Sequence, residues 1–315
     1  MLSSDISELI SELKRRGARR VALQFPEGLK RKAAGYAAAL REAGFDVVVS
    51  GDPCYGACDL ALDTLANTDV LVHVGHTPVD DQDRVIFIPY SVDFDVTILK
   101  NAIPLLKEKS VGLVTTVQHI HLVPAMKEYL RSQGIEARVA EGRGRTPCRG
   151  QVLGCSFATA RDTGAEEILY VGTGLFHPIG IALSTKKRVV ALDPLSGIAS
   201  EVSGETLLRR RFAIIEKAKA ATSTAIILST KSGQARKELA ERLAALSPGA
   251  VIVTMKEVSP DEITNLGFGC YVNTACPRLA YDDQVRFPVP VLSPQEFEIV
   301  CGKRRWDDYA IDEIP

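Results

Sequence analysis

The sequence predicts an α/β fold of three related domains, each with a mostly parallel sheet flanked by helices, arranged around a pseudo-threefold centre. Continuous apolar, β-branched runs alternate with amphipathic segments, which is typical of parallel strands buried on both faces. A similar order of strand, helix and strand occurs three times along the chain. The length of 315 residues also suggests two or three domains of roughly 100–150 residues rather than one core.

The first elements of each repeat follow one pattern after an N-terminal amphipathic helix. The apolar stripe of that helix contains Ile6, Leu9, Ile10 and Leu13. The first strands are predicted at 20–25, 110–116 and 225–230. The helices that follow them are predicted at 26–44, 117–134 and 231–246. The second strands are predicted at 45–50, 135–140 and 250–255.

The later strands complete the repeats and set the predicted domain boundaries. Third strands with glycine-rich ends lie at 69–78 and 167–178, and fourth strands at 84–91 and 188–195. The third repeat continues as 267–277 and 289–294, so its cysteine follows one strand later than the other two. We predict domains at residues 1–108, 109–222 and 223–315, carrying Cys58, Cys155 and Cys276 respectively.

Composition narrows the class of protein. Apolar residues make up 46% and charged residues 24%, which is the mix of a soluble globular protein. The net charge of −1 gives no basic field for direct nucleic-acid binding. No apolar run reaches the ~18–20 residues of a membrane span, and the first residues do not form a signal peptide. Seven cysteines, an odd number, favour a reducing cytoplasm over a disulfide framework.

Three cysteines stand where a chain leaves a strand, namely Cys58, Cys155 and Cys276. In open α/β sheets, ligands bind outside the carboxyl ends of the strands. If the three domains pack with these ends inward, the three thiolates converge. Such a set suits a [4Fe–4S] cluster with one iron open to a ligand, or a catalytic zinc with an open position. The absence of close CxxC pairs disfavours a structural zinc site.

The other four cysteines have simpler interpretations. Cys270 lies inside an apolar strand and is expected in the core. Cys301 ends a helix and Cys148 lies in a polar loop, so both are expected to be structural or incidental. Cys54 is an alternative to Cys58 as a metal ligand, because it lies only four residues before Cys58.

Several motifs resemble those of the diphthamide synthase family in its compact archaeal form. They are YGACDLA at 55–61, GQVLGCSFATA at 150–160, NTACPRLAYDD at 273–283 and STKSGQ at 229–234. The resemblance covers nearly the whole chain in the right order. It implies three related domains around a central [4Fe–4S] cluster, as in quinolinate synthase. It also implies that Cys58, Cys155 and Cys276 bind that cluster and that Cys54 does not.

The resemblance further implies an activity. The reduced cluster would cleave S-adenosylmethionine to a 3-amino-3-carboxypropyl radical and methylthioadenosine. The radical would add to C2 of a histidine imidazole in translation elongation factor 2, the first step of diphthamide formation. Homodimers and an external electron donor are implied as well. The alternatives are a quinolinate-synthase-like [4Fe–4S] dehydratase, a non-catalytic cluster-bearing subunit and a zinc-binding structural protein.

Further residues are predicted to bind S-adenosylmethionine. Glycine-rich strand ends allow close backbone approach, and a helix that starts near residue 231 would favour a carboxylate, although Ser232 as a plain N-cap is the alternative. Arg278 is predicted to face that carboxylate or the partner protein. The predicted set is Gly75, His76, Thr77, Gln118, Gly174, His177, Asp193, Ser229, Lys231, Gly233, Gln234 and Arg278.

Two basic segments, 143–149 and 209–211, are predicted to be a solvated loop and a solvated helix face. The alternative is that they contact the elongation factor.

Overall fold

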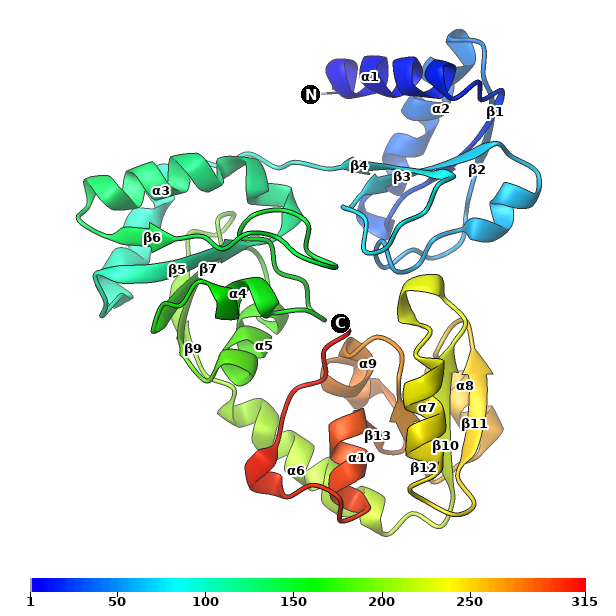
Figure 1. The fold of residues 1–315 in the computed structure, drawn as a ribbon, viewed down its shortest axis with the longest axis vertical. Coiled ribbons are helices and arrows are strands. Elements are labelled where there is room, and N and C mark those ends of the chain that lie inside the picture. Colours follow the sequence, from blue (N-terminus) through cyan, green and yellow to red (C-terminus); the bar gives the residue numbers. More distant parts are fainter. Residues whose placement is uncertain (1) are drawn as a thin grey trace. The chain divides into compact units, whose positions relative to one another are not determined.

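The computed structural model describes residues 2–315 and forms three separate sheets flanked by helices (Figure 1). The chain divides into two compact units, residues 1–92 and 93–315. The first unit holds one sheet and the second unit holds two. The predicted α/β class with mostly parallel sheets is confirmed. Among residues 2–315, no helix combines the length and apolarity needed to cross a bilayer.

The first unit contains a four-stranded parallel sheet in the order β2-β1-β3-β4. Helices α1 and α2 cover one face, where Leu9 and Leu13 of the predicted stripe are buried. A smaller apolar cluster around Ala22 and Leu71 lies on the other face. The elements of this unit are α1 (Leu2–Arg15), β1 (Arg20–Gln24), η1 (Glu27–Lys32), α2 (Ala33–Glu42), β2 (Asp46–Val49), η2 (Leu62–Ala66), β3 (Val70–Gly75) and β4 (Val85–Pro89).

The second sheet has five strands in the order β6-β5-β7-β8-β9. Its last strand is antiparallel to β8 and was not predicted from the sequence. The elements are η3 (Val96–Asn101), η4 (Ile103–Leu105), β5 (Ser110–Thr115), η5 (Val117–Leu122), α3 (Val123–Ser132), β6 (Glu136–Arg138), α4 (Ala158–Asp162), β7 (Glu167–Val171), α5 (Phe176–Thr185), β8 (Arg188–Leu192), β9 (Ala199–Val202) and α6 (Glu205–Lys219).

The third sheet has four parallel strands in the order β11-β10-β12-β13. Separate apolar clusters lie on its two faces. The elements are β10 (Thr224–Ser229), η6 (Ser232–Gln234), α7 (Lys237–Ala244), β11 (Val251–Met255), α8 (Pro260–Leu266), β12 (Cys270–Asn273), α9 (Arg278–Tyr281), η7 (Asp283–Arg286), β13 (Val291–Leu292), α10 (Pro294–Val300) and η8 (Trp306–Asp308).

All three sheets share the order second, first, third and fourth strand, once the extra strand β9 is set aside. In each, the chain starts centrally, moves to one edge, and then crosses to the other side of the first strand. This common topology agrees with the predicted internal repeat. The domain boundaries at 108 and 222 and the pseudo-threefold centre stay predictions.

The three predicted helices after the first strands begin later than expected. Each predicted segment opens with a 3-10 turn, η1, η5 or η6, before the α-helix starts. In the second repeat Pro124 lies in the first turn of α3, where its missing N–H is tolerated. In the third repeat the extended backbone of Ala235 separates η6 from α7. The predicted helix start near residue 231 is therefore wrong, and so is the alternative that Ser232 is its N-cap.

The prediction of two solvated basic segments is partly wrong. Arg209 and Arg210 are exposed, as predicted. Arg211 is buried, however, and forms a bidentate ion pair with Glu296. Arg145 is also buried, and its Nη2 donates a hydrogen bond to the carbonyl of Gly233 at 2.9 Å. A charged run therefore contains individual side chains that the fold turns inward.

Candidate metal centre

The three predicted cluster cysteines lie in loops that leave strands. Cys58 lies in the connection from β2 to β3, Cys155 in that from β6 to β7, and Cys276 directly after β12. All three are partly exposed, whereas Cys54 and Cys270 are buried. Burial raises the pKa of Cys270 to about 12, which favours the thiol over the ligating thiolate. Cys270 is thus a core residue, as predicted.

A glutamine at the end of β1 anchors the Cys58 loop. The Gln24 Nε2 donates to the carbonyl of Asp59 at 2.7 Å, and its Oε1 accepts from the N–H of Ala61 at 3.2 Å. Nδ1 of His73, on β3, lies 2.9 Å from the same Oε1. The residues after Cys58 are therefore held at the carboxyl end of the first sheet's central strand.

The same network fixes the tautomer of two histidines. Burial lowers the pKa of His73 to about 3 and that of His76 to about 4, with His76 adding to the effect on His73. Neutral His73 must donate from Nδ1 to the Gln24 oxygen, so its Nε2 accepts from Nδ1 of His76 at 2.9 Å. Nε2 of His76 is then an acceptor for a ligand. Gln24 and His73 were missed, although each is a polar residue in an apolar run.

The Cys155 loop is paired with the end of β5. Thr115 donates its N–H to the carbonyl of Gly150 and accepts from the N–H of Val152, both at 2.9 Å. Gly150 has φ +72°, which favours glycine. A Cβ on Gly154 would lie only 2.3 Å from the Phe176 ring. The two glycines of the GQVLGC motif therefore serve a turn and a close approach beside the cysteine.

The Cys276 loop is held by side chains on both sides. Asn273 accepts the N–H of Ala275 at 2.9 Å and donates from Nδ2 to the carbonyl of Cys276 at 2.8 Å. The hydroxyl of Thr274 donates to Ile227 of β10 at 2.6 Å. Arg236 donates to the carbonyls of Thr274 and Ala275. Arg236 was missed by sequence reasoning, because no local pattern links it to residues almost forty positions later.

Gly154 and Arg278, which lie close in sequence to the two cysteines of the second unit, both contact the ring of Phe176. The ring packs on Gly154, next to Cys155, and the guanidinium of Arg278, two residues after Cys276, lies 4.9 Å from its centroid. Burial, with Arg278 as a second cause, lowers the pKa of the neighbouring His177 to about 4. The predicted residues His177 and Arg278 are therefore neighbours. Arg278 also forms a partly exposed ion pair with Asp282 at 2.8 Å.

The ends of β7 and β8 carry two further polar groups. Tyr170 is fully buried, its ring stacks on His177 at 5.9 Å, and its hydroxyl has no hydrogen-bond partner among the described residues. A Cβ on Gly172 would lie 2.5 Å from that hydroxyl. Asp193 accepts the N–H of Leu195 at 2.8 Å, which gives it a role in its own turn. Tyr170 was missed because it reads as an ordinary strand residue.

The remaining predicted residues have the following positions. Gly75 ends β3 with φ +114°, Thr77 is buried, and Gly174 has φ +75° with open space at its Cβ position. Gln118 lies half-buried in η5. Ser229 and Lys231 precede η6, a 3-10 turn of three residues that contains Gly233 and Gln234.

Lys231 does not offer an isolated positive charge. Its Nζ is 2.7 Å from a carboxylate oxygen of Glu257, and its N–H bonds to the Ser229 hydroxyl. Arg145 contacts Gly233 in the same turn. These contacts bring the 143–149 loop of the second repeat against the STKSGQ stretch of the third.

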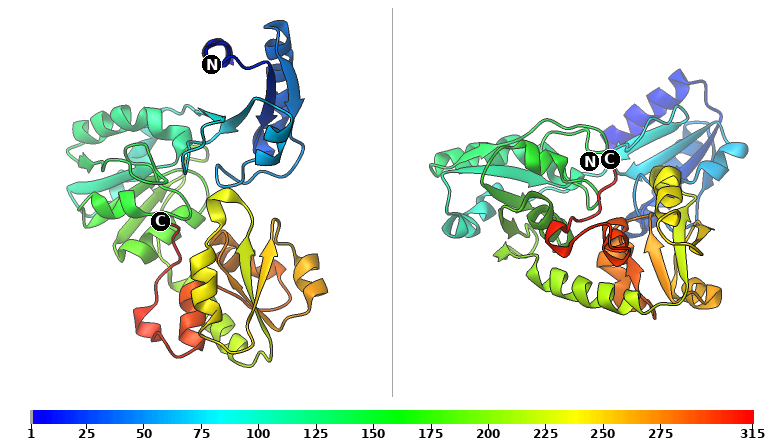
Figure 2. Two further views of the ribbon diagram at one scale, coloured as in Figure 1. Left: turned by 45° about the vertical axis from the view of Figure 1, so that its right-hand side comes forward. Right: turned by 60° about the horizontal axis from the view of Figure 1, so that its bottom comes forward.

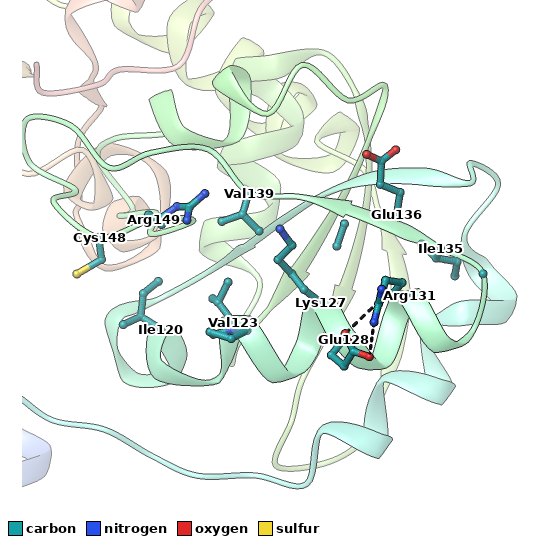
Figure 3. A pocket seen from close by; sticks show the side chains of 13 residues that line it. Ile120, Val123, Lys127, Glu128, Arg131, Ile135, Glu136, Val139, Cys148 and Arg149 are labelled. Atoms are coloured by element: carbon teal, nitrogen blue, oxygen red, sulfur yellow. Dashed lines mark hydrogen bonds and ion pairs between the residues drawn. The ribbon is translucent and has the colours of Figure 1, made fainter.

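One cavity lies apart from all these groups. It has a volume of about 920 Å³ and lies between α3 and β6, with Cys148 and Arg149 at one end (Figure 3). None of the predicted cluster or cofactor residues lines it. Within residues 2–315, no group of three histidine, cysteine, aspartate or glutamate side chains is arranged to hold a single metal ion.

Comparisons with known proteins show the family to which the chain belongs. A family model described as "Putative diphthamide synthesis protein" matches residues 25–311. The chain is 39% identical to 2-(3-amino-3-carboxypropyl)histidine synthase of Pyrococcus horikoshii over 98% of this chain and 92% of that protein. It is 30% identical to subunit 1 of the synthase of that name from Homo sapiens, over 98% of this chain and 74% of that protein.

A solved structure shares the fold. The crystal structure of Dph2 from Pyrococcus horikoshii with a 4Fe-4S cluster matches with a TM-score of 0.92 and 37% identity, over 98% of this chain and 93% of that one.

Proposed function

Because this chain belongs to the diphthamide synthesis protein family, we propose that it is a transferase acting on a histidine of a protein. It transfers the 3-amino-3-carboxypropyl group of S-adenosylmethionine to imidazole C2 and releases methylthioadenosine, in the first step of diphthamide biosynthesis. The observation that carries this proposal is the match to the 2-(3-amino-3-carboxypropyl)histidine synthase of Pyrococcus horikoshii over 98% of the chain.

Cys58, Cys155 and Cys276 would bind a [4Fe–4S] cluster through their thiolates. The donor set fits such a group, because all three sulfurs lie in partly exposed loops at the ends of strands, and thiolates are the usual cluster ligands. When bound, the cluster supplies the electron that cleaves the sulfonium bond. With three protein ligands, one iron stays open to S-adenosylmethionine.

The chain's own residues would bind and orient S-adenosylmethionine. Gly75 and Gly174 allow close backbone approach, and Nε2 of His76 offers a neutral acceptor. Arg278 and Lys231 would bind the methionine carboxylate beside their own acidic partners, Asp282 at 2.8 Å and Glu257 at 2.7 Å. The remaining members of the proposed binding set are Thr77, Gln118, His177, Asp193, Ser229, Gly233 and Gln234. These contacts would hold the reacting atoms close before the electron moves.

The protein substrate would be translation elongation factor 2. We further propose that the enzyme works in the cytoplasm as a homodimer, receives its electron from a separate donor, and contacts neither nucleic acid nor membrane directly.

The test combines cluster content with product analysis. Anaerobically purified protein should be brown, and Cys58→Ser, Cys155→Ser and Cys276→Ser should each lose iron, while Cys54→Ser should not. With dithionite, the protein should form methylthioadenosine and add the 3-amino-3-carboxypropyl group to one histidine of archaeal elongation factor 2, measured by mass spectrometry. Formation of 5′-deoxyadenosine, or an unmodified factor with turnover of a small dicarboxylate, would contradict the proposal.

A further inference from the structure

One short segment of the second unit contacts both of its cysteine loops. After η8 the chain turns back from α10 towards the second sheet and ends beside it, as the red ribbon in Figure 2 shows. Residues 311–314 of this segment, which we call the strap, are almost completely buried at three of their four positions, namely Ile311, Asp312 and Ile314.

On one side, the strap holds the arginine that contacts the Cys276 loop. The carboxylate of Asp312 forms a bidentate ion pair with Arg236, at 2.9 Å to Nη1 and 2.6 Å to Nη2. Asp312 is buried and Arg236 is largely buried, with 1% and 11% of their side chains exposed. The same guanidinium donates from Nε to the carbonyl of Thr274 at 2.7 Å and from Nη2 to that of Ala275 at 3.1 Å. The two residues before Cys276 are therefore fixed through Asp312.

On the other side, the strap contacts the Cys155 loop directly. The N–H of Ile314 donates to the carbonyl of Cys155 at 2.8 Å. A carboxylate oxygen of Glu313 accepts the N–H of Phe157 at 2.8 Å. Arg161 donates to both oxygens of that carboxylate, and Ser184 donates to one of them. Two adjacent strap residues thus hold the backbone at Cys155 and two residues after it, at Phe157.

The strap also has its own anchors. Ile311 packs into the apolar cluster that contains Phe157 and Tyr281. The Tyr281 hydroxyl accepts the N–H of Asp312 at 2.8 Å. The strap is therefore a rigid connection rather than a chance contact, because each residue from 311 to 314 is held by packing or by hydrogen bonds.

We propose that Asp312 and Glu313 are positioning residues that couple the loops of Cys155 and Cys276, so that the two sulfurs keep one spacing for the metal centre. This inference deepens the proposed function and rests on it. Bidentate, charge-assisted hydrogen bonds restrict both distance and direction, and a cluster is retained best when its ligands are already in place. Neither residue needs to touch the cluster or the substrate.

The test uses Asp312→Asn and Glu313→Gln, with Glu167→Gln as the matched control. Glu167 is as buried as Asp312 and accepts hydrogen bonds from two backbone N–H groups and from Arg188, but it begins β7, at the end opposite the cysteine loops. Cluster loss from reconstituted protein is followed by the visible absorbance band during incubation with EDTA, well below the unfolding temperature. We expect about tenfold faster loss in both strap variants, equivalent to about 1.4 kcal/mol, and the wild-type rate in the control.

A second measurement does not depend on the cluster. Hydrogen–deuterium exchange of the iron-free protein is measured for peptides that cover 150–160 and 270–280. Asp312→Asn, which acts on the Cys276 side, should also speed exchange at 150–160 about tenfold. Glu313→Gln, which acts on the Cys155 side, should likewise speed exchange at 270–280 about tenfold. Arg236→Lys, which keeps the charge but loses the planar fork, should reproduce the effect of Asp312→Asn in weaker form.

The outcomes separate the two proposals. If wild-type protein binds no cluster but the exchange of the two loops is coupled, the proposed function falls and the coupling stands. If wild-type protein binds a cluster, and the strap variants match it in cluster loss and in exchange at the opposite loop, the positioning role is rejected. Equal acceleration in Glu167→Gln would also reject it, because general destabilisation would then explain the result.

Discussion

Adding one methyl group beside Cys155 should displace the contact that joins the two cysteine loops of the second unit. In Gly154→Ala, the new Cβ would lie 2.3 Å from the Phe176 ring, more than an ångström inside the ordinary contact limit of 3.4 Å. Overpacking of this kind costs about 1–3 kcal/mol, offset by about 0.4–1 kcal/mol from the lower entropy of the unfolded chain. We expect a net loss of roughly 1–2 kcal/mol and a displaced Arg278 above the ring.

Calorimetry measures the stability loss, and iron content measures its effect on the site. A loss of 1–2 kcal/mol corresponds to a Tm roughly 2–8 °C lower for a unit of this size. Phe176→Leu in the Gly154→Ala background should recover at least half of it, because the smaller side chain makes room for the methyl. Gly269→Ala is the control, since its nearest contact is an ordinary 3.4 Å. An unchanged Tm in Gly154→Ala, or no recovery in the double variant, would refute this explanation.

Three more outcomes follow from buried groups. Because burial lowers the pKa of His73 to about 3 and of His76 to about 4, the unfolded chain binds more protons below about pH 6.5. The free energy of unfolding should fall as the pH is lowered from there to about pH 4, by up to ~1.4 kcal/mol per pH unit for each ring. Urea titrations at several pH values should show that this free energy depends less steeply on pH in His73→Gln than in the wild type. Cys270→Ser should keep its full iron content but lose about 1–3 kcal/mol, because it places a hydroxyl in the core; iron loss would contradict this. Arg211→Met should lose about 3–5 kcal/mol in urea unfolding by leaving Glu296 buried and unpaired, and a loss below about 1 kcal/mol would contradict it.

Local sequence patterns were enough to predict most of the strands and helices of the fold. Strands such as β7 and β10 are continuous apolar runs, and their repetition predicted the three sheets. The extra strand β9, Ala199–Val202, lies on an edge and has two exposed positions between two partly buried ones, so it has no such run. It forms because the turn at Asp193 brings it back against β8 as a hairpin.

The residues of the candidate site could be predicted from the sequence only where they lie in a loop that follows a strand. The three cysteines lie in loops that leave strands, so order along the chain indicated them. Arg236 and Asp312 are separated by 76 positions and lie in irregular segments. No periodicity connects such residues, and only the folded chain brings them together.

Arg211 and Arg236 of the second unit are each paired with a buried carboxylate for a common physical reason. Replacing a buried ion pair by apolar side chains is often neutral for stability, so stability alone does not explain Arg211 and Arg236. Each guanidinium also donates to two backbone carbonyls, those of Ala280 in α9 and Val291 in β13 for Arg211, and those of Thr274 and Ala275 in the Cys276 loop for Arg236. Each arginine therefore satisfies backbone acceptors from separate positions with one planar group. Arg236 can thereby hold the irregular loop before Cys276 in one conformation, which an apolar replacement could not do.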